Sequence, residues 1–222
     1  MSSSKKTALF AVLCLLSLPV FYFSFRFAMA DIAAYSVKYA VEDMDSGKAP
    51  MTLETVDAAE EKIDSAIGWW PQNAEYVELK ARLQLYRAIM GFGTPVFLSS
   101  VNNALALHQE AIELRPHWPY SWASRSLVKA YLGEFDAVYF EGFKEASRLG
   151  PWELSVNLSL LEAGLIGWQR LDESTISLVV AAAERGAEHR PKSVAELLNR
   201  YSMKYPICAR MSRGEQQVKA CR

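Results

Sequence analysis

The carboxylates of this chain do not fall at spacings that catalysis favours. Glycoside chemistry needs two carboxyl groups held about 5 to 9 Å apart. Glu60 and Glu61 are adjacent in a helical pattern, so their side chains face different directions. Two other acidic pairs fit a solvated helix face or a helix cap: Glu110 with Glu113, and Glu134 with Asp136. The sequence therefore predicts no catalytic carboxylate pair.

The nucleophiles and metal-ligating side chains give no stronger pattern. A nucleophilic triad needs Ser or Cys beside a positioned His, and nothing around His108, His117 or His189 suggests one. None of these histidines is spaced with the cysteines as zinc ligands usually are. Gly91–Gly93 is a lone GxG motif without a preceding strand, which is too weak to predict a phosphate site. We expect no enzyme, metal or cofactor.

Aromatic and arginine side chains form the best candidate for a site, and they favour binding. Trp118, Tyr120, Trp122 and Arg125 open one expected helix, and Trp152 opens a later one. These residue types dominate binding hot spots, and sugar rings also stack on tryptophan. We predict that the five residues bind a partner. The alternative is that the tryptophans fill gaps where neighbouring helix pairs meet.

The elements that carry these residues are all expected to be helices. After residue 31, apolar residues recur at three- and four-residue spacing between Pro and Gly breaks. Proline breaks a helix interior but suits the first turn of the next helix. The predicted domain, residues 31–204, therefore contains helices at about 31–45, 52–69, 73–91, 98–114, 119–132, 135–149, 152–167, 173–188 and 191–204, with no strand.

The prolines also mark a repeat. The pattern Ala-x-x-(Leu/Trp)-x-Pro ends three helices, at Pro71, Pro116 and Pro151. The intervals are 45 and 35 residues, and Pro191 follows 40 residues later. Periods of this size with two helices per unit indicate an α-solenoid. Such an array presents a concave groove lined by the first helix of each pair, where partner segments bind.

The repeat resembles tetratricopeptide-type repeats, most closely over 120–151. Ala130-Tyr131, Gly133-Glu134-Phe135-Asp136 and Ala146-x-x-Leu149-x-Pro151 follow the order of that repeat. The chain is about two residues short before Gly133 and has Tyr139 near a usually small position. The resemblance covers 52–190 and implies a degenerate solenoid of antiparallel helix pairs.

The N-terminus predicts a membrane anchor. Residues 7–25 carry no charge over nineteen positions, enough for a helix of about 28 Å. Lys5 and Lys6 precede this segment, so the positive-inside rule keeps residues 1–6 cytoplasmic and sends the domain across. The alternative is a cleaved signal peptide, because Ala28-Met29-Ala30 fits a small-x-small cleavage site.

The C-terminal tail, residues 205–222, is basic and contains Cys208 and Cys221 with twelve residues between them. Both readings of the N-terminus place the domain outside the cytoplasm, where disulfides persist. We predict a Cys208–Cys221 disulfide; two unpaired thiols in a disordered tail are the alternative. The net charge of −1 does not suggest nucleic acid as a partner.

A narrower resemblance concerns the segments 115–123, 130–136 and 150–153 behind an apolar anchor. Together they look like the small VpsP-type polysaccharide biosynthesis proteins of Gram-negative bacteria. The resemblance implies an inner-membrane, periplasmic accessory that binds other proteins of an envelope polysaccharide machine, with glycan as a further candidate partner. The alternatives are a scaffold for another envelope assembly process, or a glycan- or peptidoglycan-cleaving enzyme on an α-superhelix.

Overall fold

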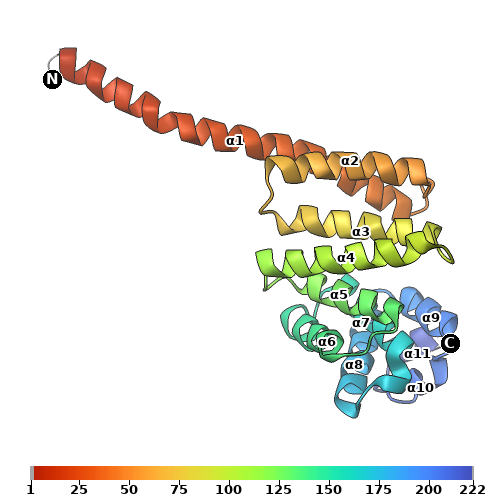
Figure 1. Ribbon diagram of the computed structural model, residues 1–222. Coiled ribbons are helices and arrows are strands. Elements are labelled where there is room, and N and C mark those ends of the chain that lie inside the picture. The colour runs from red at the N-terminus through yellow and green to blue at the C-terminus, as the bar shows by residue number, and fades with distance from the viewer. Residues whose placement is uncertain (1–2, 222) are drawn as a thin grey trace.

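The computed structural model describes residues 3–221, which form helices and connections without any strand, as predicted. Figure 1 shows the long N-terminal helix at one end of a stack of helices, with the C-terminal helices gathered at the other end. The elements are α1 (Ser3–Asp45), α2 (Leu53–Trp69), α3 (Ala74–Met90), α4 (Pro95–Leu114), α5 (Pro119–Leu132), α6 (Ala137–Leu149), α7 (Leu154–Gly167), a 3₁₀ turn η1 (Trp168–Arg170), α8 (Glu173–His189), α9 (Pro191–Arg200), α10 (Lys204–Cys208) and α11 (Glu215–Cys221).

The first helix is longer than predicted. The expected anchor and the expected helix at 31–45 are one continuous element, α1, with Pro19 inside it. No glycine or proline separates the two segments, and Ala28–Ala30 favours helix. Over the described chain, α1 is the one helix long and apolar enough to cross a membrane, and its most apolar part is exposed. The apolar segment is therefore a continuous helical extension of the domain.

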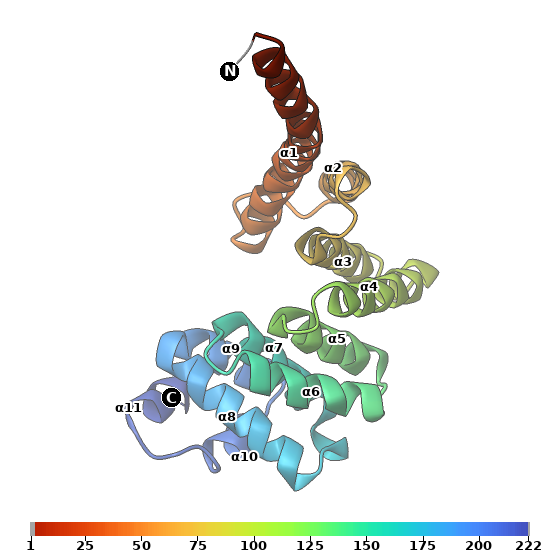
Figure 2. The same cartoon turned by 90° about the vertical axis from the view of Figure 1, so that its left-hand side faces the viewer.

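From α1 to α6 each helix packs against the next as an antiparallel neighbour, whereas α7 packs mainly on α5 and α8 (Figures 1 and 2). Small and branched side chains recur at helical spacing on the buried faces: Ala30, Ala34, Val37 and Val41 of α1 pack in one core cluster with Val56, Ala59, Ile63 and Ala66 of α2. This sequential stacking is what paired helices with one apolar stripe each require. The assignment to the tetratricopeptide class stays a prediction.

Side-chain caps set most of the boundaries. Thr52 caps α2 reciprocally with Thr55, and Asp136 accepts hydrogen bonds from the first amides of α6. Thr94 caps α4 with Pro95 in its first turn, so α4 begins three residues before the predicted start at 98. Gly133 ends α5 with a φ of +72°, a conformation that glycine adopts without strain.

The large side chain of Tyr139 is accommodated by glycine. Its ring is fully buried, and its hydroxyl donates to the Ala163 carbonyl at 2.9 Å. A Cβ on Gly167 would lie 2.7 Å from that hydroxyl oxygen. The departure from the repeat pattern at Tyr139 is therefore matched by a missing side chain on the facing helix.

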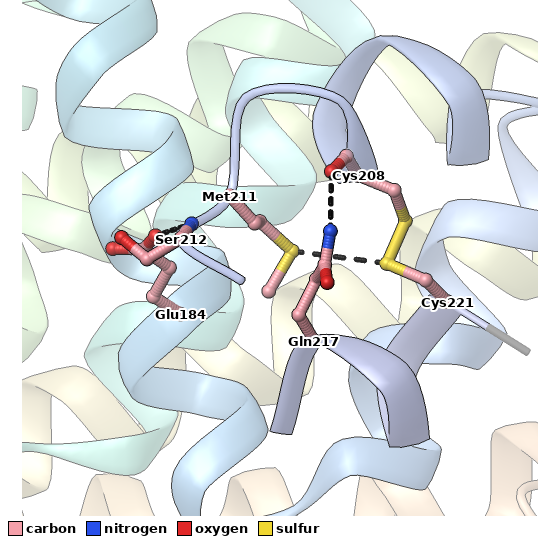
Figure 3. Close-up of a disulfide and its surroundings, with 6 residues drawn as sticks. All are labelled: Glu184, Cys208, Met211, Ser212, Gln217 and Cys221. Carbon is pink, nitrogen blue, oxygen red and sulfur yellow. Dashed lines mark hydrogen bonds between the residues drawn. A yellow bond between two sulfur atoms is a disulfide. The ribbon is translucent and has the colours of Figure 1, made fainter. Parts of the chain in front are cut away.

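The C-terminal residues are folded, which excludes the disordered-tail alternative. A disulfide joins Cys208 of α10 to Cys221 of α11 as predicted, with 6.0 Å between their Cα atoms (Figure 3). The Gln217 amide donates to the Cys208 carbonyl at 2.9 Å. The side chain of Met211, in the loop between these helices, is 5% exposed and packs in the C-terminal core. The tail thus closes the end of the array.

Candidate binding groove

One open groove of about 700 Å³ runs across the array. Its walls come from α1, α3, α5 and α7, the first helices of four successive pairs, and His108 of α4 adds to the lining. Apolar groups include Leu79, Leu127 and Val156. This is the arrangement expected when paired helices curve around their first members.

Only two of the five predicted binding residues line this groove. Trp118 and Tyr120 belong to it, whereas Trp122, Arg125 and Trp152 do not. The reason is helical periodicity: Tyr120 shares its face with residues three, four and seven positions later, while a residue two or five positions later points elsewhere. A cluster in sequence is therefore split between two faces of α5.

Trp118 and Tyr120 are both half-buried and have different polar environments. The Trp118 ring lies 3.6 Å from the Arg115 guanidinium carbon and meets the Tyr120 ring edge-on. Its indole Nε1 is buried and has no hydrogen-bond partner. The Tyr120 hydroxyl donates to Glu153, and that bond together with burial raises the pKa of Tyr120 to about 12. Both rings are positioned to contact a bound segment.

Arg125 and Trp122 serve packing. Arg125 is 4% exposed and donates to Gln109 at 2.7 Å and Glu141 at 2.9 Å, which ties α5 to α4 and α6. Its guanidinium also lies over the Trp122 ring, and the Trp122 indole donates to the Pro116 carbonyl at 2.8 Å. The prediction that Arg125 binds a partner is wrong, because its side chain is buried and both of its Nη groups already donate inside the array.

Trp152 neither lines the groove nor packs in the array as Trp122 and Arg125 do. Its side chain is 73% exposed in the connection before α7, with Arg185 as a distant cationic neighbour at 5.9 Å. The gap-filling alternative therefore does not describe Trp152. It stays an exposed aromatic outside the groove.

A hydrogen-bonded His–Glu pair that sequence reasoning missed lies at the base of the groove. The His108 imidazole is 2% exposed and pairs through Nδ1 with Glu78 at 3.0 Å. Ser121 donates to the same carboxylate at 2.8 Å. Burial favours a raised pKa for Glu78, but His108 and the hydroxyls of Ser121 and Ser124 outweigh it and hold the pKa below the usual value. His108 Nε2 is buried without a partner.

The remaining charges make the groove acidic. Five carboxylates line it and two basic side chains accompany them: Glu42, Asp45, Glu75, Glu78 and Glu162, with Lys38 and Arg82. Most of these carboxylates are engaged. Asp45 binds Arg82 and Tyr86, Glu75 binds Lys38 at 3.0 Å, and Glu162 accepts from Tyr201 at 2.8 Å. The excess of negative charge favours a basic occupant.

The polar groups of the groove bind one another. Ser121 donates to the Glu78 carboxylate and not to His108, so these three residues do not have the Ser–His–carboxylate order of a nucleophilic triad. Among residues 3–221, no group of three or more His, Cys, Asp or Glu side chains could hold a metal ion.

No family model matches the chain, and no curated protein matches it. Its class is therefore defined by geometry alone: an all-α stack of antiparallel helices with a long apolar N-terminal helix and an acidic groove.

Proposed function

We propose that this chain is a membrane-anchored binding protein that holds a segment of a partner protein in its groove. The observation that carries the proposal is the continuity of the groove over four first helices, with the exposed side chains of Ile89 and Tyr131 beside an excess of carboxylates. Such a surface suits an extended or helical segment that carries both apolar and basic residues. We assign no catalytic step to the chain.

The proposed address is a bacterial inner membrane with the domain in the periplasm. α1 supplies a single span, and Lys5 and Lys6 before it favour a cytoplasmic N-terminus. The Cys208–Cys221 disulfide supports an oxidising compartment for the rest of the chain. Alkaline phosphatase fused after residue 48 is active if the domain is exported. An inactive fusion would overturn this address.

The proposed process is the assembly or export of an envelope polysaccharide, with other proteins of that machine as partners. This part rests on the sequence resemblance of segments 115–123, 130–136 and 150–153. Photo-crosslinked partners that belong to polysaccharide assembly support it. Partners that all belong to another envelope process would replace it while leaving the groove proposal standing.

The groove proposal is tested by site-specific photo-crosslinking in the membranes of cells that express the chain. A photoreactive residue at Ser155, which is exposed in the groove, should give a discrete crosslinked partner. The same residue at Ser177, exposed on α8 outside the groove, is the matched control. Equal crosslinking at both positions would contradict the proposal.

A pair of charge reversals tests the electrostatic part. Glu42 is exposed in the groove, whereas Glu188 is exposed outside it. Glu42→Lys should lower the yield of the Ser155 crosslink several-fold, because it opposes a basic occupant. Glu188→Lys makes the same change in net charge and should leave the yield unchanged. A loss in both variants would indicate non-specific attraction only.

A further inference from the structure

Two consecutive tryptophans meet the apolar helix where it enters the domain. Trp69 ends α2, and Trp70 is its C-terminal cap. The Trp70 ring packs edge-on against Phe23 and Phe27 of α1, with ring centroids 6.3 and 6.0 Å apart. Trp69 meets Phe25 in the same way at 5.9 Å. These contacts form a cluster of aromatic rings where the end of α2 meets one short section of α1.

Arg26 lies beside this aromatic cluster. It is half-buried, although most side chains of the preceding apolar segment are exposed. Its guanidinium donates one long hydrogen bond, 3.4 Å, to the Gly68 carbonyl, and it forms no ion pair with any carboxylate of the described chain. A guanidinium carries five N–H donors, so most of its donor capacity is unused.

Arg26 also lines a recess of about 230 Å³. The other lining residues are Phe23, Trp69, Trp70, Pro71 and Gln72. No carboxylate belongs to this set, so an anion that enters the recess meets a partly desolvated guanidinium without a competing negative charge. Guanidinium groups bind phosphate through two parallel hydrogen bonds.

The position along α1 identifies the source of that phosphate. Arg26 is the first charged residue after the uncharged segment 7–25, so it lies where a span of that length leaves the hydrocarbon. Tryptophan concentrates at this depth because its ring is apolar and its N–H is polar. Figure 1 shows the connection between α2 and α3 at the end of the stack from which the apolar half of α1 extends.

We propose that Arg26, Trp69 and Trp70 form a binding site for the phosphate group of a membrane phospholipid. We call these three residues the membrane seat, because they hold the helical domain against the bilayer surface. This inference rests on the proposed membrane span. The seat joins α2 to the bilayer as well as α1, so it limits rotation of the domain about its anchor. The groove then keeps a fixed orientation to the membrane.

The test uses the full chain in nanodiscs of phosphatidylcholine and phosphatidylglycerol that contain a headgroup-attached nitroxide. Cys14→Ser removes the one free cysteine of the described chain. Gln72→Cys then carries a fluorophore at the recess, and Ser46→Cys carries it at the far end of α1 as the control. We expect nitroxide quenching at position 72 to exceed that at position 46 several-fold. Equal quenching would overturn the seat.

Arg26→Gln tests the phosphate contact, with Arg170→Gln, an exposed arginine outside the recess, as its matched control. Arg26→Gln should reduce quenching at position 72 severalfold, and Arg26→Lys should restore part of it. Arg170→Gln should change nothing. Wild-type quenching in Arg26→Gln would overturn the phosphate site, provided that circular dichroism shows an unchanged helix content. Inorganic phosphate should lower quenching at position 72 by competing for Arg26, and this effect should be absent in Arg26→Gln.

Membrane extraction and quenching together distinguish a chain without a membrane span from a chain without the membrane seat. Alkaline carbonate releases peripheral proteins and leaves spanning ones in the membrane. A chain that resists extraction but shows equal quenching at positions 46 and 72 retains its anchor and lacks the seat. A chain that is extracted overturns the span, and the seat with it.

Discussion

The Glu78 carboxylate and the His108 imidazole pair at the base of the groove, with 3.0 Å between Oε2 and Nδ1. The contact joins α3 to α4 beneath the surface that we propose for partner binding. Ser121 of α5 donates to the same carboxylate, so three successive helices meet at one partly buried carboxylate. The groove floor is therefore held by polar contacts as well as by apolar packing.

Replacing His108 should destabilise the domain strongly. His108→Ala removes the main counter-group of a carboxylate that stays in place, and it leaves a gap where the ring was. We expect a loss of about 2 kcal/mol or more in the free energy of unfolding, measured by chemical denaturation of the detergent-solubilised chain. Glu110→Gln, an exposed change on the same helix, should stay within about 0.5 kcal/mol. Similar values for the two variants would contradict the role of the pair.

The same pair predicts acid sensitivity. The pKa of Glu78 is lower in the folded protein than its ordinary value of 4.5, so the unfolded chain binds more protons on the acid side. The stabilisation is fully present above that value and is lost as the pH falls through the folded pKa. Glu78→Gln should therefore flatten the fall in stability between about pH 5 and pH 3. An unchanged pH profile in this variant would exclude Glu78 as a contributor.

Much of the fold could be predicted because its signals are local. Proline breaks, caps and three- or four-residue spacing place the helices, and the helix-pair period indicates which helices face inward. The continuity of α1 through residues 26–30 follows from the absence of a breaker, a signal that the separate treatment of anchor and domain overlooked. The early start of α4 follows from Thr94 and Pro95.

The site was harder to predict because its residues are distant in sequence. Glu78 and His108 are 30 residues apart, and only the stacking of α3 on α4 brings them together. One signal was present: His108 follows Val101 and Ala104, and precedes Ala111, at helical spacing on a buried face. A histidine on such a face needs a partner. The sequence does not identify that partner, because it depends on the tertiary packing.

The two faces of α5 should respond differently to alanine substitution. Arg125→Ala removes the hydrogen bonds of a buried guanidinium to Gln109, Val138 and Glu141, and we expect it to cost about 2 to 3 kcal/mol of stability. Tyr120→Ala should cost less and should weaken the Ser155 crosslink several-fold, because Tyr120 lines the groove. Denaturation and crosslinking yield measure the two effects. A larger stability loss for Tyr120→Ala would reverse the assignment of the faces.

The disulfide should matter mainly to the end of the array. The combined Cys208→Ser and Cys221→Ser variant relaxes a short closed loop, for which the chain-entropy relation gives about 3 kcal/mol. Because the loop carries α11, amide hydrogens of Glu215–Cys221 should exchange faster in this variant. Those of α3 should keep their protection. Faster exchange throughout the chain would show that the C-terminal closure stabilises the whole array.

The contact between α5 and α6 depends on the missing side chain of Gly142. A Cβ added there would lie 2.0 Å from Ser126 Oγ and 2.9 Å from the Trp122 carbonyl oxygen. Ser126 is fully buried and donates to the Tyr139 carbonyl at 2.9 Å, so its side chain cannot move away freely. Gly142→Ala should therefore separate the two helices and cost about 1 to 3 kcal/mol.

Gly68 provides the opposite case within the same chain. It lies in the last turn of α2, and a Cβ there would meet nothing within 4 Å. Gly68→Ala should raise stability by about 0.5 to 1 kcal/mol, because it restricts the unfolded chain and favours helix.

Adding Ser126→Ala to Gly142→Ala removes the closer of the two obstructing atoms but leaves the Trp122 carbonyl, so it should restore only part of the loss. If Gly142→Ala and Gly68→Ala had the same effect on stability, close approach of α5 and α6 would not be what requires glycine at position 142.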